Sequence, residues 1–208
     1  MNGNILITGA NLVLPTGIEK GDLRITSGVI SEISTTDRLE SNDDEMIYDA
    51  TGLHVLPGAI DPQVHFREPG QEYKEDLRTG SAAAASGGTT SFLDMPNNKP
   101  SATTLESIQA KIDSANKKCI TNFGFFIGAT SDNIEELQKA VGKPGKGVSH
   151  PGICGIKIFM GSSTGDLLVY EVEHLTNIFS NTAGLIAVHA EDENRLNERF
   201  EDYKDRRD

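Results

Sequence analysis

Short hydrophobic runs separated by turn-forming residues fill the first part of the chain. Runs of this length, bounded by Gly, Asn and Ser, are typical of β-strands. The pair Ser27-Gly28 lies between two such runs and predicts a hairpin turn. We therefore expect residues 1–57 to form a small all-β segment. The strands expected there are residues 5–8, 12–14, 46–48 and 53–56, with further strand residues on both sides of the hairpin turn.

From residue 58 onward the pattern changes to short apolar runs that alternate with helical spacing of apolar residues. The expected strands are residues 59–66, 89–95, 122–128, 155–160 and 185–190. The expected helices are residues 74–86, 103–116, 132–141 and 169–180, and a fifth from about residue 192. Ser131 or Asp132 is expected to cap the third helix, and Gly142 to end it. Strands that alternate with helices predict a parallel sheet with crossover helices. We therefore expect a second domain over residues 58–208.

Two α/β architectures fit this alternation. A βα unit takes roughly 30 residues, so residues 59–208 hold five units. A closed (β/α)₈ barrel needs eight units and typically ~250 residues. The chain is thus either a partial (β/α)₈ barrel, made of its first five βα units behind a small β-sandwich segment, or a five-stranded doubly wound parallel sheet. The helical pattern of residues 193–208 continues to the last residue without a following strand, which favours the partial barrel.

Composition removes several classes of function. The net charge is −12 and no run is rich in Lys or Arg, so we expect no nucleic-acid partner. The two cysteines, Cys119 and Cys154, lie in apolar runs and are expected to be free thiols in a reducing compartment. No signal-peptide pattern is present, and no apolar run approaches the ~20 residues that span a bilayer. We expect a cytoplasmic protein with a small-molecule substrate and no membrane partner.

Polar and reactive side chains cluster where the expected parallel strands end. Ligands bind at these carboxyl ends in both architectures. His65 ends the first strand, Asn97 follows the second, and His189 ends the fifth. Either histidine taken by itself is more commonly structural. Lys157 lies inside the fourth strand between two isoleucines, so it must reach solvent, find a partner or lose its charge.

An uncharged amine at Lys157 could take up CO₂ and become a carbamate, which is an anionic oxygen ligand able to bridge two metal ions. Two imidazoles together with such a carbamate would suit zinc. Arg67 presents the planar fork that fits a carboxylate, and Asn97 offers both a donor and an acceptor. Both residues could equally be ordinary loop residues. No GxGxxG or GxxxxGK[ST] motif occurs, which argues against nucleotide binding.

Together, these residues and their neighbours resemble a known family. The segments PGAIDPQVHFREPG, EYKEDLRTGSAAAASGGTT, DMPNNKP, GIKIFMGSSTG and VHAED occur in this order over about residues 52–192. In order and spacing they resemble the dihydroorotases of the amidohydrolase superfamily. The resemblance implies a (β/α)₈ barrel flanked by a small sandwich domain. It also implies one or two zinc ions, bound by His65 and His189 and bridged by carboxylated Lys157, with Arg67 and Asn97 holding the substrate carboxylate.

The implied reaction is the reversible, zinc-dependent hydrolysis of the cyclic amide of L-dihydroorotate to N-carbamoyl-L-aspartate in pyrimidine biosynthesis. The sequence departs from the family pattern at Gln63, where a second histidine is usual, and a carboxamide oxygen is a poorer zinc ligand than imidazole. The resemblance also places a further histidine and the Asp general base beyond residue 208, so we expect no turnover from these 208 residues by themselves.

Two other functions remain open at this stage. One is a non-catalytic dihydroorotase-like subunit that assembles with aspartate transcarbamoylase, which Gln63 favours. The other is a cyclic amidohydrolase of the hydantoinase or allantoinase type. For protein partners we expect either a homo-oligomer or aspartate transcarbamoylase.

Overall fold

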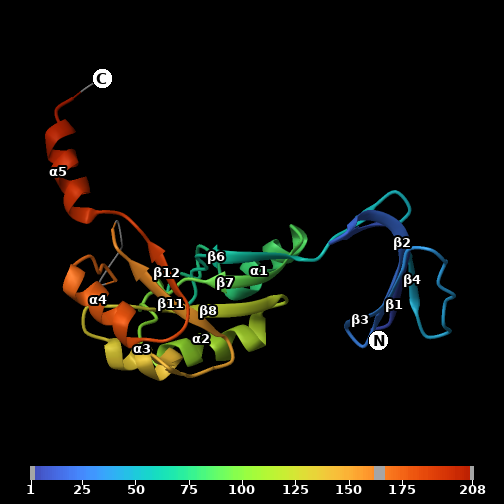
Figure 1. The fold of residues 1–208 in the computed structure, drawn as a ribbon, viewed down its shortest axis with the longest axis horizontal. Coiled ribbons are helices and arrows are strands. Elements are labelled where there is room, and N and C mark those ends of the chain that lie inside the picture. Colours follow the sequence, from blue (N-terminus) through green and yellow to red (C-terminus); the bar gives the residue numbers. More distant parts are fainter. Residues whose placement is uncertain (1–2, 162–166, 207–208) are drawn as a thin grey trace. The chain divides into compact units, whose positions relative to one another are not determined.

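The chain forms two compact units, Met1–Gly58 and Ala59–Asp208. Figure 1 shows the secondary structure of both units in a computed structural model that describes residues 3–161 and 167–206. The last part of the GIKIFMGSSTG segment, residues 162–165, lies outside the described residues. No helix in the described ranges is long and apolar enough to cross a membrane.

The first unit is one small sheet. Its strands are β1 (Ile5–Leu14), β2 (Gly17–Thr26), β3 (Val29–Ser34), β4 (Met46–Asp49) and β5 (His54–Val55). They are ordered β3-β2-β1-β4, and β5 also pairs with β1. The predicted hairpin turn is confirmed: Ser27 and Gly28 have φ values of 52° and 80° and join β2 to β3, as a two-residue turn of this kind requires.

One expectation for this unit was wrong. Residues 5–8 and 12–14 were expected as two strands because Gly9-Ala10-Asn11 reads as a break. They belong to the single strand β1, whose pairing with β2 shifts register between Ile7 and Ala10. Gly9 has a φ of 68°, so the chain takes up the irregularity as a bulge and continues as the same strand.

The second unit alternates strands and helices as predicted. Its main strands are β6 (Ala59–Val64), β7 (Thr89–Asp94), β8 (Asn122–Gly128), β11 (Ile153–Phe159) and β12 (Ile186–His189). The helices are α1 (Leu77–Ser86), α2 (Leu105–Lys118), α3 (Ile134–Val141), α4 (Val172–Asn181) and α5 (Glu193–Tyr203). A short hairpin, β9 (Gly142–Lys143) with β10 (Lys146–Gly147), was not predicted.

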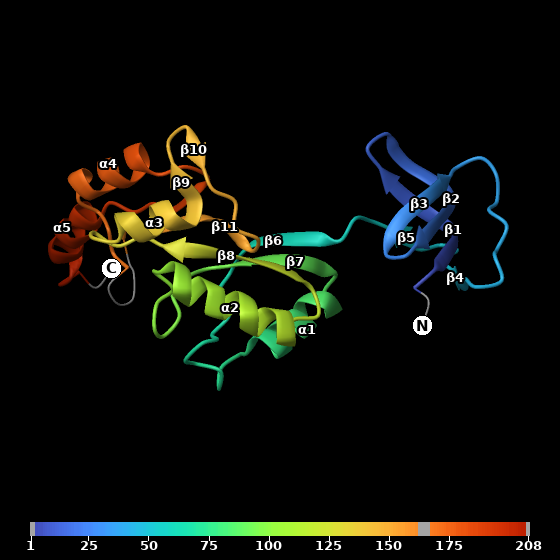
Figure 2. The same ribbon diagram turned by 90° about the horizontal axis from the view of Figure 1, so that it is seen from below.

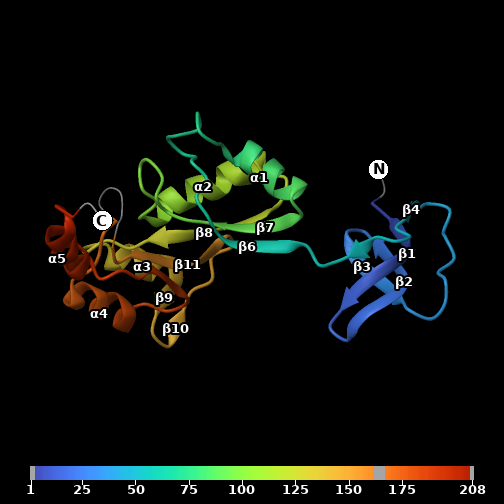
Figure 3. The same ribbon diagram turned by 90° about the horizontal axis from the view of Figure 1, so that it is seen from above.

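The order of the strands identifies the architecture. The sheet runs β12-β11-β8-β7-β6 and every neighbouring pair is parallel. This order follows the chain without a reversal, whereas a doubly wound sheet reverses its strand order at a switch point. The doubly wound alternative was therefore wrong, and the partial barrel is confirmed. Figures 2 and 3 show the crossover helices α1 to α4 following one another around the curled sheet.

Helix starts were predicted less accurately than helix positions. α1 begins at Leu77, three residues after the expected start, because Asp76 caps it and exchanges reciprocal hydrogen bonds with Thr79. α3 begins at Ile134 after Asn133, so the expected cap at Ser131 or Asp132 was wrong. The expected stop at Gly142 is confirmed as the residue that ends α3.

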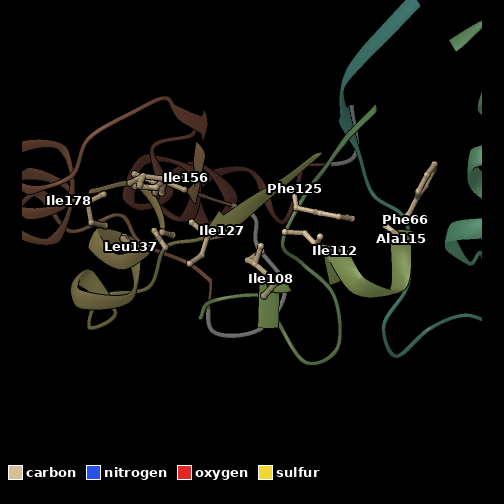
Figure 4. Packing of buried hydrophobic residues seen from close by; sticks show 14 of the residues in the cluster. Phe66, Ile108, Ile112, Ala115, Phe125, Ile127, Leu137, Ile156 and Ile178 are labelled. Carbon is tan, nitrogen blue, oxygen red and sulfur yellow. The ribbon is translucent and has the colours of Figure 1, made fainter. Parts of the chain in front are cut away.

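The main hydrophobic core lies between the sheet and its helices. Figure 4 shows part of it, including Ile127 beside Leu137 of α3 and Ile156 near Ile178 of α4. Ile156 and Ile158 belong to this core and are fully buried. Successive side chains of a strand point to opposite faces, so Lys157 projects from the other face of the sheet, away from the helices.

Candidate active site

Two loops carry three of the candidate residues. The β6 loop, residues 65–70, follows β6 and contains His65 and Arg67, and the β7 loop, residues 95–100, follows β7 and contains Asn97. β6 and β7 are adjacent parallel strands whose last residues, Val64 and Asp94, are paired. The carboxyl ends of parallel strands meet at one edge of the sheet, so both loops leave the sheet side by side.

His65 and Asn97 are in direct contact. The distance between His65 Nδ1 and Asn97 Oδ1 is 2.7 Å. An amide oxygen only accepts hydrogen bonds, so Nδ1 must carry the proton and donate it. In the neutral ring this leaves the lone pair on Nε2, the arrangement in which a metal-binding histidine is oriented by a carbonyl partner. It also leaves the amide nitrogen of Asn97 as a donor.

Lys157 is buried on the inner face of the sheet. Only 1% of the residue is exposed, so the alternative of a strand-end lysine that reaches solvent was wrong. Its Nζ lies 5.1 Å from the centroid of the Phe159 ring, and within the described part of the chain it forms no ion pair. Burial lowers the pKa of the Lys157 ammonium from its usual value, because desolvation penalises the charged form.

His189 lies beside the same phenylalanine ring. It is the last residue of β12 and is paired with Phe159 of β11. The two rings stack with centroids 6.4 Å apart, and His189 Nε2 lies 3.2 Å from Glu191 Oε2. Phe159 therefore contacts both Lys157 and His189, which were predicted as ligands from widely separated positions in the sequence.

The polar residues of β6 and of the loop after it lie in different surroundings. Strand β6 ends at Val64 and not at residue 66, so His65 and Arg67 lie in the loop. Asp61 and Gln63 are exposed, and the Gln63 backbone N–H donates to Asp61 Oδ1 at 3.0 Å. Gln63, the residue that departs from the family pattern, therefore lies at the surface of the described chain.

A buried ion pair beside the two loops was not predicted. Lys111 of α2 is 2% exposed and its Nζ lies 2.8 Å from Oδ2 of the fully buried Asp94. Burial raises the pKa of Asp94 and lowers that of Lys111, and their mutual attraction opposes both changes. The sequence carried a signal, because Lys111 lies on the apolar stripe of α2 between Ile108 and Ala115.

A conventional metal site is absent from residues 3–161 and 167–206, where no group of three or more His, Cys, Asp or Glu side chains could hold an ion. A metal at this edge of the sheet would therefore need a ligand besides the His, Cys, Asp and Glu side chains of the described residues. The buried amine of Lys157, whose pKa is lowered, has the chemistry to supply one as a carbamate. In ligand type, such a carbamate, Nε2 of His65 and the ring of His189 would suit zinc. The contacts that the structure shows bring Lys157 and His189 together at Phe159, and His65 together with Asn97.

Comparisons with known proteins agree with this fold and identify the family. A family profile described as Amidohydrolase family matches residues 54–201. The chain is 37% identical over 192 residues to a protein named dihydroorotase from Methanosarcina mazei, a match that covers 91% of this chain and 40% of that protein. It is 36% identical over 179 residues to a protein named allantoinase from Deinococcus radiodurans, covering 82% of this chain and 38% of that protein.

A solved structure has the same fold as this chain over most of its length. The L-hydantoinase (dihydropyrimidinase) of Arthrobacter aurescens has a TM-score of 0.82 and 25% sequence identity, and the match covers 97% of this chain and 44% of that one. The chain thus spans about two fifths of the length of the relatives that it matches.

Proposed function

The chain belongs to the amidohydrolase family, and we propose that it carries part of the active site of a zinc-dependent dihydroorotase. Its relatives named dihydroorotase, allantoinase and L-hydantoinase support a cyclic amide hydrolase. The proposed reaction is the reversible hydrolysis of L-dihydroorotate to N-carbamoyl-L-aspartate in the cytoplasm. Because the chain spans about two fifths of these relatives, turnover would also need groups that these 208 residues do not supply, among them the Asp general base.

Three side chains would hold the metal. His65 would bind through Nε2, His189 through Nδ1 with Glu191 orienting the ring from the other side, and Lys157 through a carbamate. When bound, zinc lowers the pKa of a water molecule and polarises the amide carbonyl. Phe159 and the burial of Lys157 keep the amine poorly solvated, which favours the neutral form that reacts with CO₂.

The observation that carries the choice of dihydroorotate is the hydrogen bond between His65 and Asn97. It occupies the amide oxygen of Asn97 and leaves its NH₂ group as a donor beside the loop that carries Arg67. An amide donor and a guanidinium together suit a carboxylate. L-dihydroorotate has such a group beside its cyclic amide, whereas an unsubstituted hydantoin does not. Holding the carboxylate would orient the ring for attack.

The test of the metal site is zinc binding by the 208-residue chain in bicarbonate buffer, measured as metal retained after gel filtration. We expect about one zinc ion per chain or more, and a loss of affinity of about tenfold or more in Lys157→Met. Lys146→Met, which changes an exposed lysine of β10, is the matched control and should bind as the unmodified chain does. A zinc-free chain would contradict the proposal.

The test of the substrate is the binding of L-dihydroorotate and of unsubstituted hydantoin to the zinc-loaded chain by calorimetry. Arg67→Met should weaken dihydroorotate binding by about tenfold to a hundredfold and leave hydantoin binding unchanged. Arg78→Met, at an exposed position of α1, is the control. Equal effects of Arg67→Met on both ligands would favour a hydantoinase-type or allantoinase-type substrate instead.

One observation favours a second function. Gln63 replaces the usual second histidine and is exposed in the described chain, which would weaken the first metal position. A dihydroorotase-like subunit that assembles with aspartate transcarbamoylase without catalysis would tolerate this change. Absence of bound zinc, together with co-purification with aspartate transcarbamoylase, would support that function and exclude the enzyme.

A further inference from the structure

A single buried lysine connects the two loops that carry the candidate site. Lys111 Nζ has three hydrogens and three acceptors: Asp94 Oδ2 at 2.8 Å, Asn98 Oδ1 at 2.6 Å and the Met95 carbonyl at 3.3 Å. Every hydrogen of the ammonium therefore has an acceptor on the segment of residues 94–98. Lys111 Nζ also lies over the ring of Phe125, 4.7 Å from the ring centroid.

The groups that Lys111 holds bind in turn to the β6 loop. Asp94 Oδ1 accepts from the Phe66 backbone N–H at 2.9 Å. The side-chain amide of Asn98 donates to the carbonyls of Phe66 and Glu68, both at 3.0 Å. Both backbone groups of Phe66 are thus fixed by side chains that Lys111 orients.

The same segment fixes the chain on the other side of His65. The Met95 N–H donates to the Val64 carbonyl at 2.9 Å, so the residues before and after His65 are both tied to residues 94–98. Asn97, the hydrogen-bond partner of His65, lies within that segment. A shift of Asp94 or Asn98 would therefore move His65 and Asn97 relative to each other.

We propose that Lys111 is a positioning residue of the candidate site. Its ammonium group, acting through Asp94 and Asn98, holds the β6 loop and the β7 loop in one fixed arrangement. The ammonium touches neither His65 nor Arg67, and it acts through hydrogen-bonded partners as outer-shell groups of metal sites do. Its role toward a metal rests on the proposed function, whereas its role in fixing the two loops does not.

The test compares Lys111→Met with Lys117→Met, which places the same substitution at an exposed position of the same helix. The first readout is amide hydrogen exchange, followed by mass spectrometry of peptides from the β6 loop and from β8. Lys111→Met should speed exchange in the β6 loop by about tenfold or more, because the loop opens locally, and leave β8 protected. Lys117→Met should change neither peptide.

The second readout is zinc affinity. Lys111→Met should weaken it by about tenfold or more, as the loss of an outer-shell partner does, and Lys117→Met should not. If the unmodified chain binds no zinc, the proposed function fails and the exchange readout alone decides the role of Lys111. Unchanged exchange in the β6 loop would overturn the inference. Equal loss of protection in the loop and in β8 would overturn it too, since Lys111 would then only stabilise the fold.

A second variant keeps the test decisive if Lys111→Met does not fold because Asp94 is left as an unpaired buried charge. The double variant Asp94→Asn with Lys111→Met removes both charges and keeps an acceptor for the Phe66 N–H. Asn98 still loses the ammonium that orients it. We expect β8 to remain protected and the β6 loop to exchange faster than in the unmodified chain. Full protection of the loop in this variant would overturn the proposal.

Discussion

Asn97 determines where His65 carries its proton, because the acceptor oxygen of the amide faces Nδ1 at 2.7 Å. The sequence predicted both residues for the site but in separate roles, one as a zinc ligand and one for the substrate. Their contact links the two proposed roles, since the side chain whose oxygen faces the imidazole keeps its NH₂ group as a donor. Residue types at strand ends can be read from a sequence, whereas a contact across 32 positions needs the fold.

The thiol of Cys119 is expected to react slowly because it is partly buried. Cys119 is half-buried, its Sγ lies 3.8 Å from the Leu77 carbonyl, and burial raises its pKa from 9.0 to about 11. Near neutral pH, a thiol with a pKa of about 11 has about a hundredfold less thiolate than a thiol with a pKa of 9.0. We therefore expect Cys119 to react with iodoacetamide about a hundredfold more slowly than a peptide thiol of pKa 9.0, measured by mass spectrometry.

The control for this thiol is the same protein unfolded in guanidinium chloride, where both cysteines should react at the rate of a free peptide. Cys154 also has its pKa raised by burial and should behave in the same direction as Cys119. Rapid alkylation of Cys119 in the folded protein would contradict the prediction. The expectation of free thiols is confirmed, and the expectation of a reducing compartment stays a prediction.

At the scale of elements, Glu68 ties the β6 loop to two helices. Its carboxylate accepts from the Leu77 N–H at the start of α1 at 3.0 Å, and from Ser114 and Lys118 of α2 at 2.7 and 2.5 Å. Burial acts to raise the pKa of Glu68, but the hydrogen bonds and the charge of Lys118 outweigh it and hold the pKa below its usual range. One loop carboxylate therefore stabilises the packing of three segments.

The lowered pKa of Glu68 makes its contribution to the free energy of unfolding depend on pH. A carboxylate whose folded pKa lies below its unfolded value contributes stability above the unfolded value, near 4.5, and loses it as the pH falls through the folded pKa. Glu68→Gln should lower the free energy of unfolding by ~1–2 kcal/mol at pH 7. The difference from the unmodified chain should shrink as the pH falls below 4.5.

Urea denaturation at several pH values measures this difference. Glu198→Gln is the control, because it changes an exposed glutamate on α5, a helix without buried residues. A difference for Glu68→Gln that stays constant down to pH values where carboxylates are protonated would contradict the ionic role of Glu68.

The strands and helices of the second unit could be predicted because each has a clear period of apolar residues. The residues at which they begin and end could not be predicted, because these depend on tertiary contacts that the spacing of apolar residues does not reveal. β6 stops at Val64 where its neighbour β7 stops, and the loop that follows is fixed by Asp94. The burial of Lys111 was unpredicted for a related reason. A lysine on the apolar stripe of a helix has no visible partner in the sequence until the fold places Asp94, at the end of a strand, beside it.

At the scale of the whole molecule, each unit has its own core. In the first unit the core cluster is formed by the buried residues Ala10, Leu12, Leu23 and Ala50. The core of the second unit is much larger and includes residues of β7, β8 and β11, of the loop after β6, and of α1 to α4. The sequence indicated two patterns, since the change from all-β runs to strand-helix alternation is abrupt. Strand order, which decided between a partial barrel and a doubly wound sheet, depends on pairing that no local pattern specifies.

Separate cores predict that the chain does not unfold in one step, because the stability of each unit follows the apolar surface that it buries. The smaller core of the first unit should melt first. Leu12→Ala should lower the first transition and Ile127→Ala the second, each by ~2–5 kcal/mol in its own unit, because both side chains are at most 1% exposed. Calorimetry resolves the two transitions, and exchange of amides in β1 and β8 assigns them. A single transition that both variants lower equally would show that the two units unfold as one.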